Sequence, residues 1–359
     1  MTLPTDPHKP HDCILVTGSS GRIGRAFIDR YHDRFTEYAF DREGPPHPPS
    51  TAEYIIPCDM SSDESVREAL DQVRAKGGTR LASVLHLAAY YDFSGKPSPL
   101  YHDITVKGTE RLLRGLRDFE VEQFVFTSTM LVHQPSTPGL VITEDDPLNP
   151  KWEYPKSKVE TEALIHRERG DIPTVSLRVA GVYDDGTHSI PIAQHMQRIY
   201  ERQFLSHFFP GEFEHGQSFL HMDDLVEALY QTIVRREILN PESVFLLGEP
   251  DVMSFAELQR ELAGLIHGEA HWFTLPVPKV LAKVGAWAQG VLPGADPFIR
   301  PWMIDRADDH FAVDISLAQA LLHWEPRRTL RRSLPKMVAA LKADPQKWYK
   351  ENGLEYPGR

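Results

Sequence analysis

The chain has 359 residues, of which 41% are hydrophobic and 25% are charged, and its formal net charge is -12. These values are typical of a folded globular protein and exclude a disordered or fibrous chain. The length predicts one large α/β domain with a smaller addition, or two lobes. The negative charge argues against nucleic-acid binding, which needs lysine and arginine clustered over a broad face.

The N-terminal residues, the length of the apolar segments and the cysteines indicate where the protein is located. Residues 1–11 are rich in proline and polar residues and lack the apolar core of a secretory signal, so we expect a disordered tail. No segment approaches the roughly 20 apolar residues that a membrane-spanning helix needs, so we expect no integral membrane segment. Cys13 and Cys58 lie in apolar, strand-like runs, which predicts neither a disulfide framework nor a cysteine metal site. We expect a reducing, cytoplasmic location.

Short apolar runs alternate with longer amphipathic segments from Cys13 to Arg178. This alternation is typical of a parallel sheet built from β-α-β units. The predicted strands are 13–17, 36–40, 53–57, 83–87, 122–128 and 173–178, and the predicted crossover helices include 63–75, 98–118 and 154–169. After Arg178 the pattern is less regular, with a helical run at 223–236 and a strand-like run at 243–247. We therefore predict an α/β fold with a doubly wound parallel sheet.

Three glycines, Gly18, Gly21 and Gly24, follow the first predicted strand. At a strand–helix junction the first permits a tight turn, the second lets the backbone approach a pyrophosphate, and the third lets helix and strand pack closely. Free N–H groups at the start of the helix attract phosphates. No Gly-Lys-Ser/Thr sequence follows, so ATP is disfavoured. The alternative is a glycine-rich turn with no ligand.

The second predicted strand ends at Asp41, about twenty residues beyond the glycines, which is the usual position for a carboxylate that binds the adenosine ribose. A carboxylate there would repel the 2′-phosphate of NADP, so we expect NAD as the cofactor. Arg42 follows directly and could turn toward such a phosphate, which leaves NADP as the less favoured cofactor. An aspartate that only forms a turn is the alternative.

Tyr154 and Lys158 lie four residues apart, on one face of a predicted helix. A phenol with an ordinary pKa near 10 is a poor acid or base at neutral pH, and a neighbouring ammonium favours the phenolate. Upstream, the strand at 122–128 leads into the hydroxyls of Thr127, Ser128 and Thr129, which could hold a substrate carbonyl or alcohol. Alone, a Tyr-x-x-x-Lys pair is also common on solvated helix faces.

These motifs appear in an order that resembles the extended short-chain dehydrogenase/reductases, also called the NAD-dependent epimerase/dehydratase group. The resemblance is strong over about the first two-thirds of the chain, and the series is more specific than any one member. The motifs are Thr17-Gly-x-x-Gly-x-x-Gly24, Asp41, Cys58-Asp59-Met60, His86-Leu-Ala-Ala89, Val106-Lys-Gly-Thr109, Phe124 to Thr129, Tyr154-x-x-x-Lys158, Leu177-Arg178 with Gly181-Val-Tyr183, and Phe219 to Asp224.

The resemblance implies a role for each matched residue. Thr129, with Ser128 as second choice, would orient the reacting oxygen, Tyr154 would be the acid/base, and Lys158 would support it and bond the nicotinamide ribose. Asp59 would meet the adenine. The implied cofactor-binding residues are Gly18, Ser20, Gly21, Arg22, Ile23, Gly24, Asp41, Arg42, Asp59, Met60, Leu87, Ala88, Ala89, Thr127, Tyr154 and Lys158. Residues 12–180, with 218–248 returning to them, would form the NAD-binding Rossmann domain, and 181–217 with 249–345 a smaller substrate-binding lobe.

Three departures from the family pattern concern Thr105, Gly181 and Val132-His133-Gln134, the last of which stands where many members have Val-Tyr-Gly. Thr105 replaces the asparagine that many members carry. Gly181 stands where sugar-nucleotide enzymes often have an asparagine on the diphosphate, and Gln217 stands near their usual basic residue. Apolar rings are available instead, at Phe204, Phe208, Phe209, Phe213, Trp272, Phe273 and Trp287. A compact or hydrophobic alcohol or ketone is therefore the expected substrate, although these rings could equally fill the core.

The predicted activity is reversible hydride transfer between NAD(P) and an alcohol or carbonyl carbon of a small, non-nucleotide substrate. Two alternatives stay open: a nucleotide-sugar epimerase or dehydratase that retains NAD, and a non-catalytic NAD(H)-sensing protein. We expect no metal, because His207, His215 and His221 have no regular ligand spacing. The resemblance also implies a homodimer through the helices at 98–118 and 152–169. Tyr90, Tyr91, Phe93 and His133 face either the substrate or the core.

Overall fold

The computed structural model describes residues 12–92, 95–283 and 301–358. Seven parallel strands form the main sheet, in the order β12-β8-β7-β5-β1-β2-β3. The strands are β1 (Asp12–Thr17), β2 (Phe35–Asp41), β3 (Tyr54–Pro57), β5 (Ser83–His86), β7 (Phe124–Thr129), β8 (Thr174–Val179) and β12 (Glu242–Leu247). Every predicted strand is present, and the doubly wound parallel sheet is confirmed. The strand order reverses between β1 and β5, which is where such sheets bind ligands.

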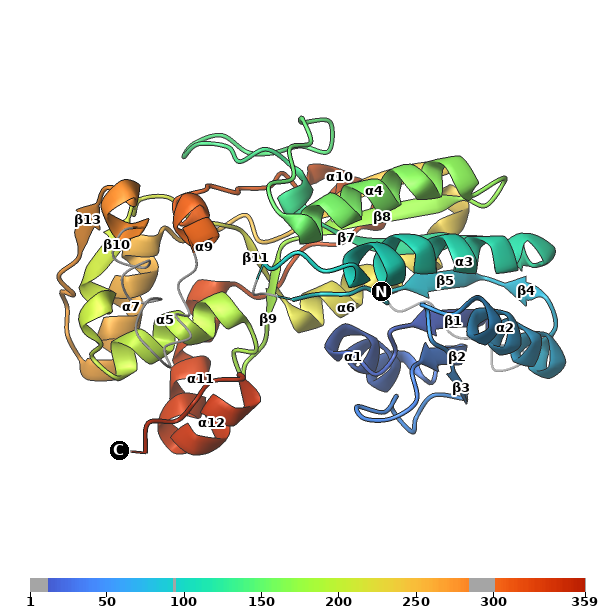
Figure 1. Ribbon diagram of the computed structural model, residues 1–359, viewed down its shortest axis with the longest axis horizontal. Coiled ribbons are helices and arrows are strands. Elements are labelled where there is room, and N and C mark those ends of the chain that lie inside the picture. Colours follow the sequence, from blue (N-terminus) through green and yellow to red (C-terminus); the bar gives the residue numbers. More distant parts are fainter. Residues whose placement is uncertain (1–11, 93–94, 284–300, 359) are drawn as a thin grey trace.

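Helices cover both faces of this sheet (Figure 1). The alternation along β1 explains why: Ile14 and Val16 belong to one buried cluster and Leu15 to another, on the opposite face. The first cluster is covered by α1 (Arg22–Tyr31), α6 (Met222–Val234) and α10 (Ser316–Leu322), and the second by α2 (Asp63–Gly77), α3 (Lys107–Gly115) and α4 (Glu153–Glu168). A strand buried on both sides must be apolar at successive positions, as β1 is.

The predicted helix 98–118 consists of three pieces rather than one. A π-helical turn at Tyr101–Val106 precedes α3, and a 3-10 turn at Leu116–Asp118 follows it. In the wide π turn, the hydroxyl of Thr105 accepts a hydrogen bond of 3.0 Å from the backbone N–H of Tyr90. Thr105 therefore ties this helix to the loop after β5, beside the carboxyl ends of the strands.

A smaller lobe stands at one end of the sheet (Figure 1). Its elements are α5 (Ile190–Tyr200), α7 (Phe255–His267), α9 (Pro301–Arg306), α11 (Leu330–Ala343), α12 (Pro345–Glu351), and the paired short strands β10 (Phe208–Pro210) and β13 (Leu275–Val277). A third buried cluster, which includes Met196, Leu262 and Trp348, joins α5, α7, α11 and α12. The sequence analysis did not predict α11 and α12.

Short strands complete the fold. β9 (Gly181–Tyr183) pairs with β11 (Phe219–His221) at the junction with the smaller lobe, and β4 (Arg80–Leu81) pairs with β6 (Glu120–Val121). No helix in the described part of the chain is long and apolar enough to cross a bilayer. Cys13 and Cys58 are both free. The predicted tail, 1–11, together with Phe93 and Trp287, lies outside the described residues.

Candidate active site

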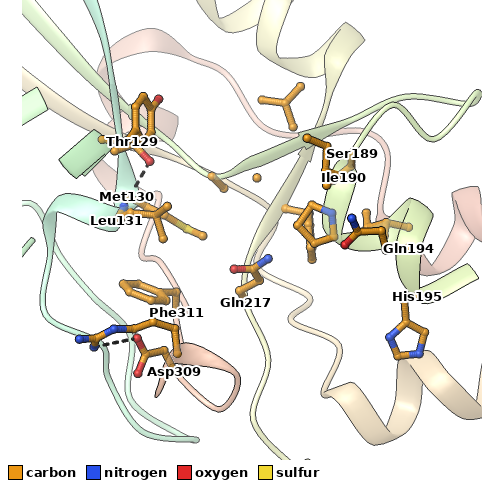
Figure 2. A pocket seen from close by; sticks show the side chains of 18 of the residues that line it. Thr129, Met130, Leu131, Ser189, Ile190, Gln194, His195, Gln217, Asp309 and Phe311 are labelled. Carbon is orange, nitrogen blue, oxygen red and sulfur yellow. Dashed lines mark hydrogen bonds and ion pairs between the residues drawn. The ribbon is translucent and has the colours of Figure 1, made fainter. Parts of the chain in front are cut away.

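A cavity of about 1150 Å³ lies at the carboxyl ends of β1, β5, β7 and β8, between the sheet and the smaller lobe. Figure 2 shows Thr129, Met130 and Leu131 on one side of this cavity and Ser189, Ile190, Gln194 and His195 on the opposite side, with Gln217 between them. Of the predicted site residues, those that line it are Gly18, Gly21, Arg22, Ile23, Gly24, Leu87, Ala89, Thr127, Thr129, Tyr154 and Lys158. The others, Ser20, Asp41, Arg42, Asp59, Met60 and Ala88, are not among the residues that line it.

The glycine loop between β1 and α1 has no room for a side chain at Gly18 or Gly24. Gly18 has a φ of +68°, and a Cβ there would lie 2.8 Å from the backbone nitrogen of Ala88. A Cβ at Gly24 would lie 2.5 Å from the Gly18 carbonyl oxygen. Helix α1 begins without a side-chain cap and has no acidic residue in its first turn, so its first N–H groups face the cavity unopposed. The loop thus fits a pyrophosphate.

The end of β2 is tied to the glycine loop. The backbone N–H of Ser20 donates to Oδ2 of Asp41 over 2.9 Å, and the N–H of Arg42 donates to Oδ1 over 2.8 Å. Each carboxylate oxygen has a second lone pair, so Asp41 can still accept hydrogen bonds from a ribose. The side chain of Arg42 is exposed.

Asp59 and Met60 follow β3 and differ in exposure. Asp59 is partly exposed, and its Oδ1 accepts hydrogen bonds from the backbone and hydroxyl of Ser61, at 2.9 and 2.7 Å. Met60 is 6% exposed and belongs to the core cluster under α2 and α3. The structure therefore gives Met60 a packing role, whereas the carboxylate of Asp59 is at the surface near the end of the sheet.

Tyr154 and Lys158 lie one turn apart on α4, and both line the cavity with Thr129. The ammonium of Lys158 donates to the carbonyl oxygen of Thr127 over 2.7 Å and lies 5.7 Å from the centre of the Tyr154 ring. The hydroxyl oxygen of Thr129 accepts a hydrogen bond of 3.3 Å from the N–H of Leu131, which leaves its proton free to donate. Tyr91 packs edge-on against Tyr154, with ring centres 4.8 Å apart.

Burial dominates the titration of this pair. It lowers the pKa of Lys158 to about 7, with Glu162 opposing the shift, and it raises the pKa of Tyr154 above its usual value. The direction for the tyrosine is opposite to the one expected from the ammonium alone, because removal of the phenol from water outweighs the attraction between the two groups.

Ser128, the second choice for the catalytic hydroxyl, belongs to a different network. It borders the cavity, but its hydroxyl donates to the carboxylate of Glu162. That carboxylate forms an ion pair of 2.8 Å with Arg178, which also contacts Nε2 of His133 at 3.0 Å. Thr129 is therefore the hydroxyl available to a substrate. His133 is fully buried and does not line the cavity, and burial and Arg178 lower its pKa to about 4.

A buried histidine positions the loop after β5, a role that the sequence analysis missed. The hydroxyl of Thr17 contacts Nδ1 of His86 at 2.7 Å and accepts from the N–H of Ala88 at 3.1 Å. Nε2 of His86 contacts the hydroxyl of Thr109 at 2.8 Å, and that hydroxyl donates to the carbonyl oxygen of Thr105. These donors place the ring proton on Nε2. The pattern His86 to Ala89 carries the signal, but the hydrogen-bond partners of the ring, Thr17 and Thr109, come from two other segments.

The substrate side of the cavity is largely apolar. Its rings and aliphatic side chains include Leu131, Phe208, Phe209, Met253, Phe255, Leu258 and Phe311. A Cβ at Gly181 would lie 2.9 Å from the ring of Phe219, so this ring occupies the space that an asparagine side chain would need. Phe204 and Phe273 are 75% and 66% exposed, and their assignment to the substrate pocket is wrong.

The histidines considered as metal ligands have other partners. Nδ1 of His207 contacts the carbonyl oxygen of Phe273 at 2.8 Å, and Nδ1 of His221 accepts from the N–H of Asp223 at 3.1 Å. Within the described ranges, no group of three or more histidine, cysteine or acidic residues could hold a metal ion.

One ion pair joins the glycine loop to the segment after β9. The guanidinium of Arg22, which lines the cavity, lies 3.3 Å from Oδ2 of Asp184. Asp184 also contacts Nδ1 of His188 at 2.7 Å and accepts from the N–H of Gly186 at 2.8 Å. The cofactor side and the substrate side of the cavity are thus connected directly, through a side chain that the family motif places next to the phosphates.

The glycine loop on a doubly wound sheet and the Thr129, Tyr154 and Lys158 set define an enzyme of the short-chain dehydrogenase/reductase class, either an oxidoreductase or an epimerase. The family model for the NAD dependent epimerase/dehydratase family matches residues 14–248, and the chain belongs to this family.

Curated relatives include enzymes with different substrates. The chain is 26% identical over 268 residues to a UDP-glucose 4-epimerase of Vibrio cholerae, covering 72% of this chain and 76% of that one. It is 24% identical over 346 residues to 3 beta-hydroxysteroid dehydrogenase type 7 of Mus musculus, covering 88% and 93%. Among solved structures, the UDP-glucose 4-epimerase of Thermus thermophilus in complex with NAD has a TM-score of 0.68 at 20% identity, covering 92% and 99%. That last similarity shows the fold.

Proposed function

We propose that the protein is an NAD-dependent oxidoreductase that transfers a hydride to or from an alcohol or carbonyl carbon of a small, non-nucleotide substrate. The observation that carries the proposal is that Thr129, Tyr154 and Lys158 line the same cavity as the glycine loop. A non-catalytic NAD(H)-sensing protein would not need all three side chains at the cavity. When bound, the nicotinamide would accept or return the hydride.

The side chains of this chain would orient the substrate and move its proton. The hydroxyl of Thr129, free to donate, would hold the reacting oxygen, and the phenol of Tyr154 would exchange a proton with it. The ammonium of Lys158 is fixed by the Thr127 carbonyl, where it would also bind the ribose diol and lower the cost of forming the phenolate. With a pKa near 7, Lys158 would itself gain or lose a proton near neutral pH.

The wall facing these residues supports a substrate without a diphosphate. The Phe219 ring excludes a side chain at position 181, and Gln217, a neutral amide, projects into the cavity. Two phosphates buried there would need charged donors for compensation. Apolar contact with Phe208, Phe209 and Phe311 would instead favour a hydrophobic alcohol or ketone.

A nucleotide-sugar epimerase or dehydratase that retains NAD is the second candidate. It is favoured by a specific observation: Arg198 and Arg306 line the substrate side of the cavity and could reach an anionic group. Such an enzyme returns the hydride to the same substrate, so it keeps its cofactor through turnover.

We further propose that the cofactor is NAD rather than NADP, on the basis of Asp41. We also propose a cytoplasmic location and a homodimer that uses the faces of α3 and α4.

The first experiment is a thermal-shift screen of the NAD-bound protein. UDP-, GDP- and dTDP-sugars are compared with a series of apolar alcohols and ketones, and cofactor that co-purifies with the protein is identified by mass spectrometry. We expect stabilisation by apolar ligands only, and exchangeable NAD. Stabilisation by any nucleotide sugar at micromolar concentration, together with tightly retained NAD, would establish the second candidate instead.

Substitution at α4 then tests the proposed chemistry. Tyr154→Phe keeps the ring but removes the transferable proton, so turnover should fall about 10²- to 10⁴-fold while the Kd for NAD stays nearly constant. Lys158→Met should impair both turnover and NAD affinity. Tyr230→Phe, in which a ring stacked on Tyr31 away from the cavity loses its hydroxyl, is the control. Wild-type turnover in Tyr154→Phe would show that Tyr154 is not the acid/base.

A further inference from the structure

Arg198 is a cation at the cavity wall with no acidic partner among the described residues. It lies in the last turn of α5 and lines the cavity, and none of its side-chain nitrogens has a hydrogen bond or ion pair within the described chain. The other arginines that line the cavity have acidic partners: Arg306 lies 3.3 Å from Asp309, and Arg22, on the side of the glycine loop, lies 3.3 Å from Asp184. Arg198 is partly buried, and placing a cation in such a site without a compensating charge destabilises the folded protein, so a bound anion would offset this cost.

A second unsatisfied polar group lies at the same end of the cavity. His195, one turn before Arg198, is 7% exposed, and its Nε2 atom is buried with no hydrogen-bond partner. Burial and the neighbouring guanidinium lower the pKa of His195 to about 3, so the ring is neutral and adds no charge. Phe255 packs against the His195 ring with centres 4.5 Å apart. Buried polar groups are normally satisfied, so an unpartnered imidazole beside an unpartnered guanidinium points to a missing ligand group.

This end of the cavity lies away from the reacting groups. In Figure 2, His195 lies on the side opposite Thr129, with Gln217 between them. Around Arg198 and His195, the cavity is lined by Leu205, Phe208 and Phe255. A ligand that reaches from one end to the other therefore meets a polar group at each end and apolar side chains along its body.

We propose that Arg198 and His195 form a carboxylate-binding subsite, and that the substrate is an apolar molecule with an alcohol or carbonyl at one end and a carboxylate at the other. This inference rests on the proposed function. A guanidinium binds a planar carboxylate with two parallel hydrogen bonds. A phosphate or diphosphate is less suited, because Arg198 lies at the C-terminal end of α5, where the helix dipole opposes a dianion.

The test uses two hydroxy acids of different shape, 12-hydroxydodecanoate and lithocholate, and the methyl ester of each. Their Kd values are measured by calorimetry with NAD bound. We expect each carboxylate to bind about 10- to 100-fold more tightly than its ester, the range for hydrogen bonds to a charged group. Arg198→Met should reduce this preference to within about threefold, and Arg198→Lys should retain part of it. Arg202→Met, which removes a surface arginine paired with Glu269, is the matched control and should retain all of it.

A stability measurement accompanies the titrations. Without ligand, Arg198→Met should have a higher Tm than the wild type, because an unpaired, partly buried charge is replaced by an apolar side chain of similar length. With a saturating carboxylate, the wild type should gain more in Tm than the variant. A lower ligand-free Tm for Arg198→Met would contradict the proposal, since it would show that Arg198 has a stabilising partner in the folded protein.

The remaining outcomes separate the subsite from the proposed function. Equal affinity for acid and ester, a preference that survives Arg198→Met, or binding of neither acid would overturn the subsite. If the esters are oxidised as fast as the acids, with NADH formation lost in Tyr154→Phe, the function stands and the subsite fails. If the acids bind through Arg198 but no NADH forms, the subsite stands and the function fails. Arg198-dependent binding of UDP-glucose, tighter than that of either acid, would overturn both.

Discussion

At the residue scale, the proposed preference for NAD over NADP rests on the carboxylate of Asp41. The Ser20 and Arg42 N–H groups fix its orientation at the end of β2, next to the glycine loop. NAD(H) should therefore bind more tightly than NADP(H), and Asp41→Ala should narrow the ratio of the two Kd values about tenfold, the effect of removing about 1.4 kcal/mol of repulsion. Fluorescence titration of both cofactors measures this ratio.

Two further variants separate the charge of Asp41 from its geometry. Asp41→Asn keeps an oxygen acceptor but no charge, so it should narrow the ratio as Asp41→Ala does. Asp33→Ala, at the exposed turn before β2, should leave the ratio unchanged. Tighter binding of NADP(H) by the wild type would contradict the role of Asp41 and would identify Arg42 as a phosphate ligand.

At the scale of elements, β2 carries a buried carboxyl group, and its apolar neighbours do not stabilise the charged form of that group. Glu37 is 0% exposed, and neither of its oxygens has a side-chain hydrogen-bond partner among the described residues. Burial raises its pKa to about 8. Because the folded pKa exceeds the unfolded value near 4.5, the contribution of Glu37 to the free energy of unfolding is highest below pH 4.5 and is lost as the pH rises to about 8.

Glu37→Gln should remove this pH dependence. The difference in the free energy of unfolding, variant minus wild type, should increase by on the order of 3 kcal/mol between pH 5 and pH 8, as the raised pKa implies. Urea unfolding at four pH values measures the difference. Glu68→Gln on the exposed side of α2 is the control and should show a constant difference. Parallel curves for wild type and Glu37→Gln would show that Glu37 is not protonated in the folded protein.

Element prediction succeeded where a single physical signal dominates. Strands buried on both faces are continuous apolar runs, so β1, β5 and β7 were visible in the sequence. The helix predicted at 98–118 was wrong in detail, because the π turn at Tyr101–Val106 depends on hydrogen bonds such as that of Thr105 with Tyr90. Such a bond joins residues from different segments, and hydrophobic periodicity carries no information about it.

At the scale of the whole molecule, the sheet side of the cavity could be predicted from the sequence, and the wall formed by the smaller lobe could not. The residues predicted at the cavity, such as Gly18, Tyr154 and Lys158, each belong to a short motif with fixed spacing. The opposite wall comes from segments far apart in the chain, around His195, Phe255 and Phe311, which meet only because the smaller lobe folds against the sheet. No local pattern specifies that meeting, so the sequence analysis named few of these residues and did not distinguish the buried rings from exposed ones such as Phe204.

The Arg22–Asp184 ion pair crosses between these two parts, and a bound pyrophosphate would compete with Asp184 for Arg22. Asp184→Asn should therefore lower the Kd for NAD. The expected change is about threefold, because partly exposed ion pairs are of modest strength, and it should become smaller at high salt. Titration at 20 and 300 mM NaCl, concentrations chosen as about one tenth and twice physiological ionic strength, tests this. Asp185→Asn, which removes a pair with Lys336, is the control. Weaker NAD binding by Asp184→Asn would contradict the competition.

This competition has a kinetic consequence. Asp184 anchors His188 and precedes Ser189 to Gln194, which line the substrate side of the cavity. When the cofactor draws Arg22 away, this segment loses one attachment to the glycine loop and becomes free to adjust to a substrate. Cofactor binding would therefore precede substrate binding, and steady-state kinetics should follow a compulsory order in which the oxidised and reduced cofactors inhibit each other competitively. Random-order kinetics would indicate that the two sides of the cavity act independently.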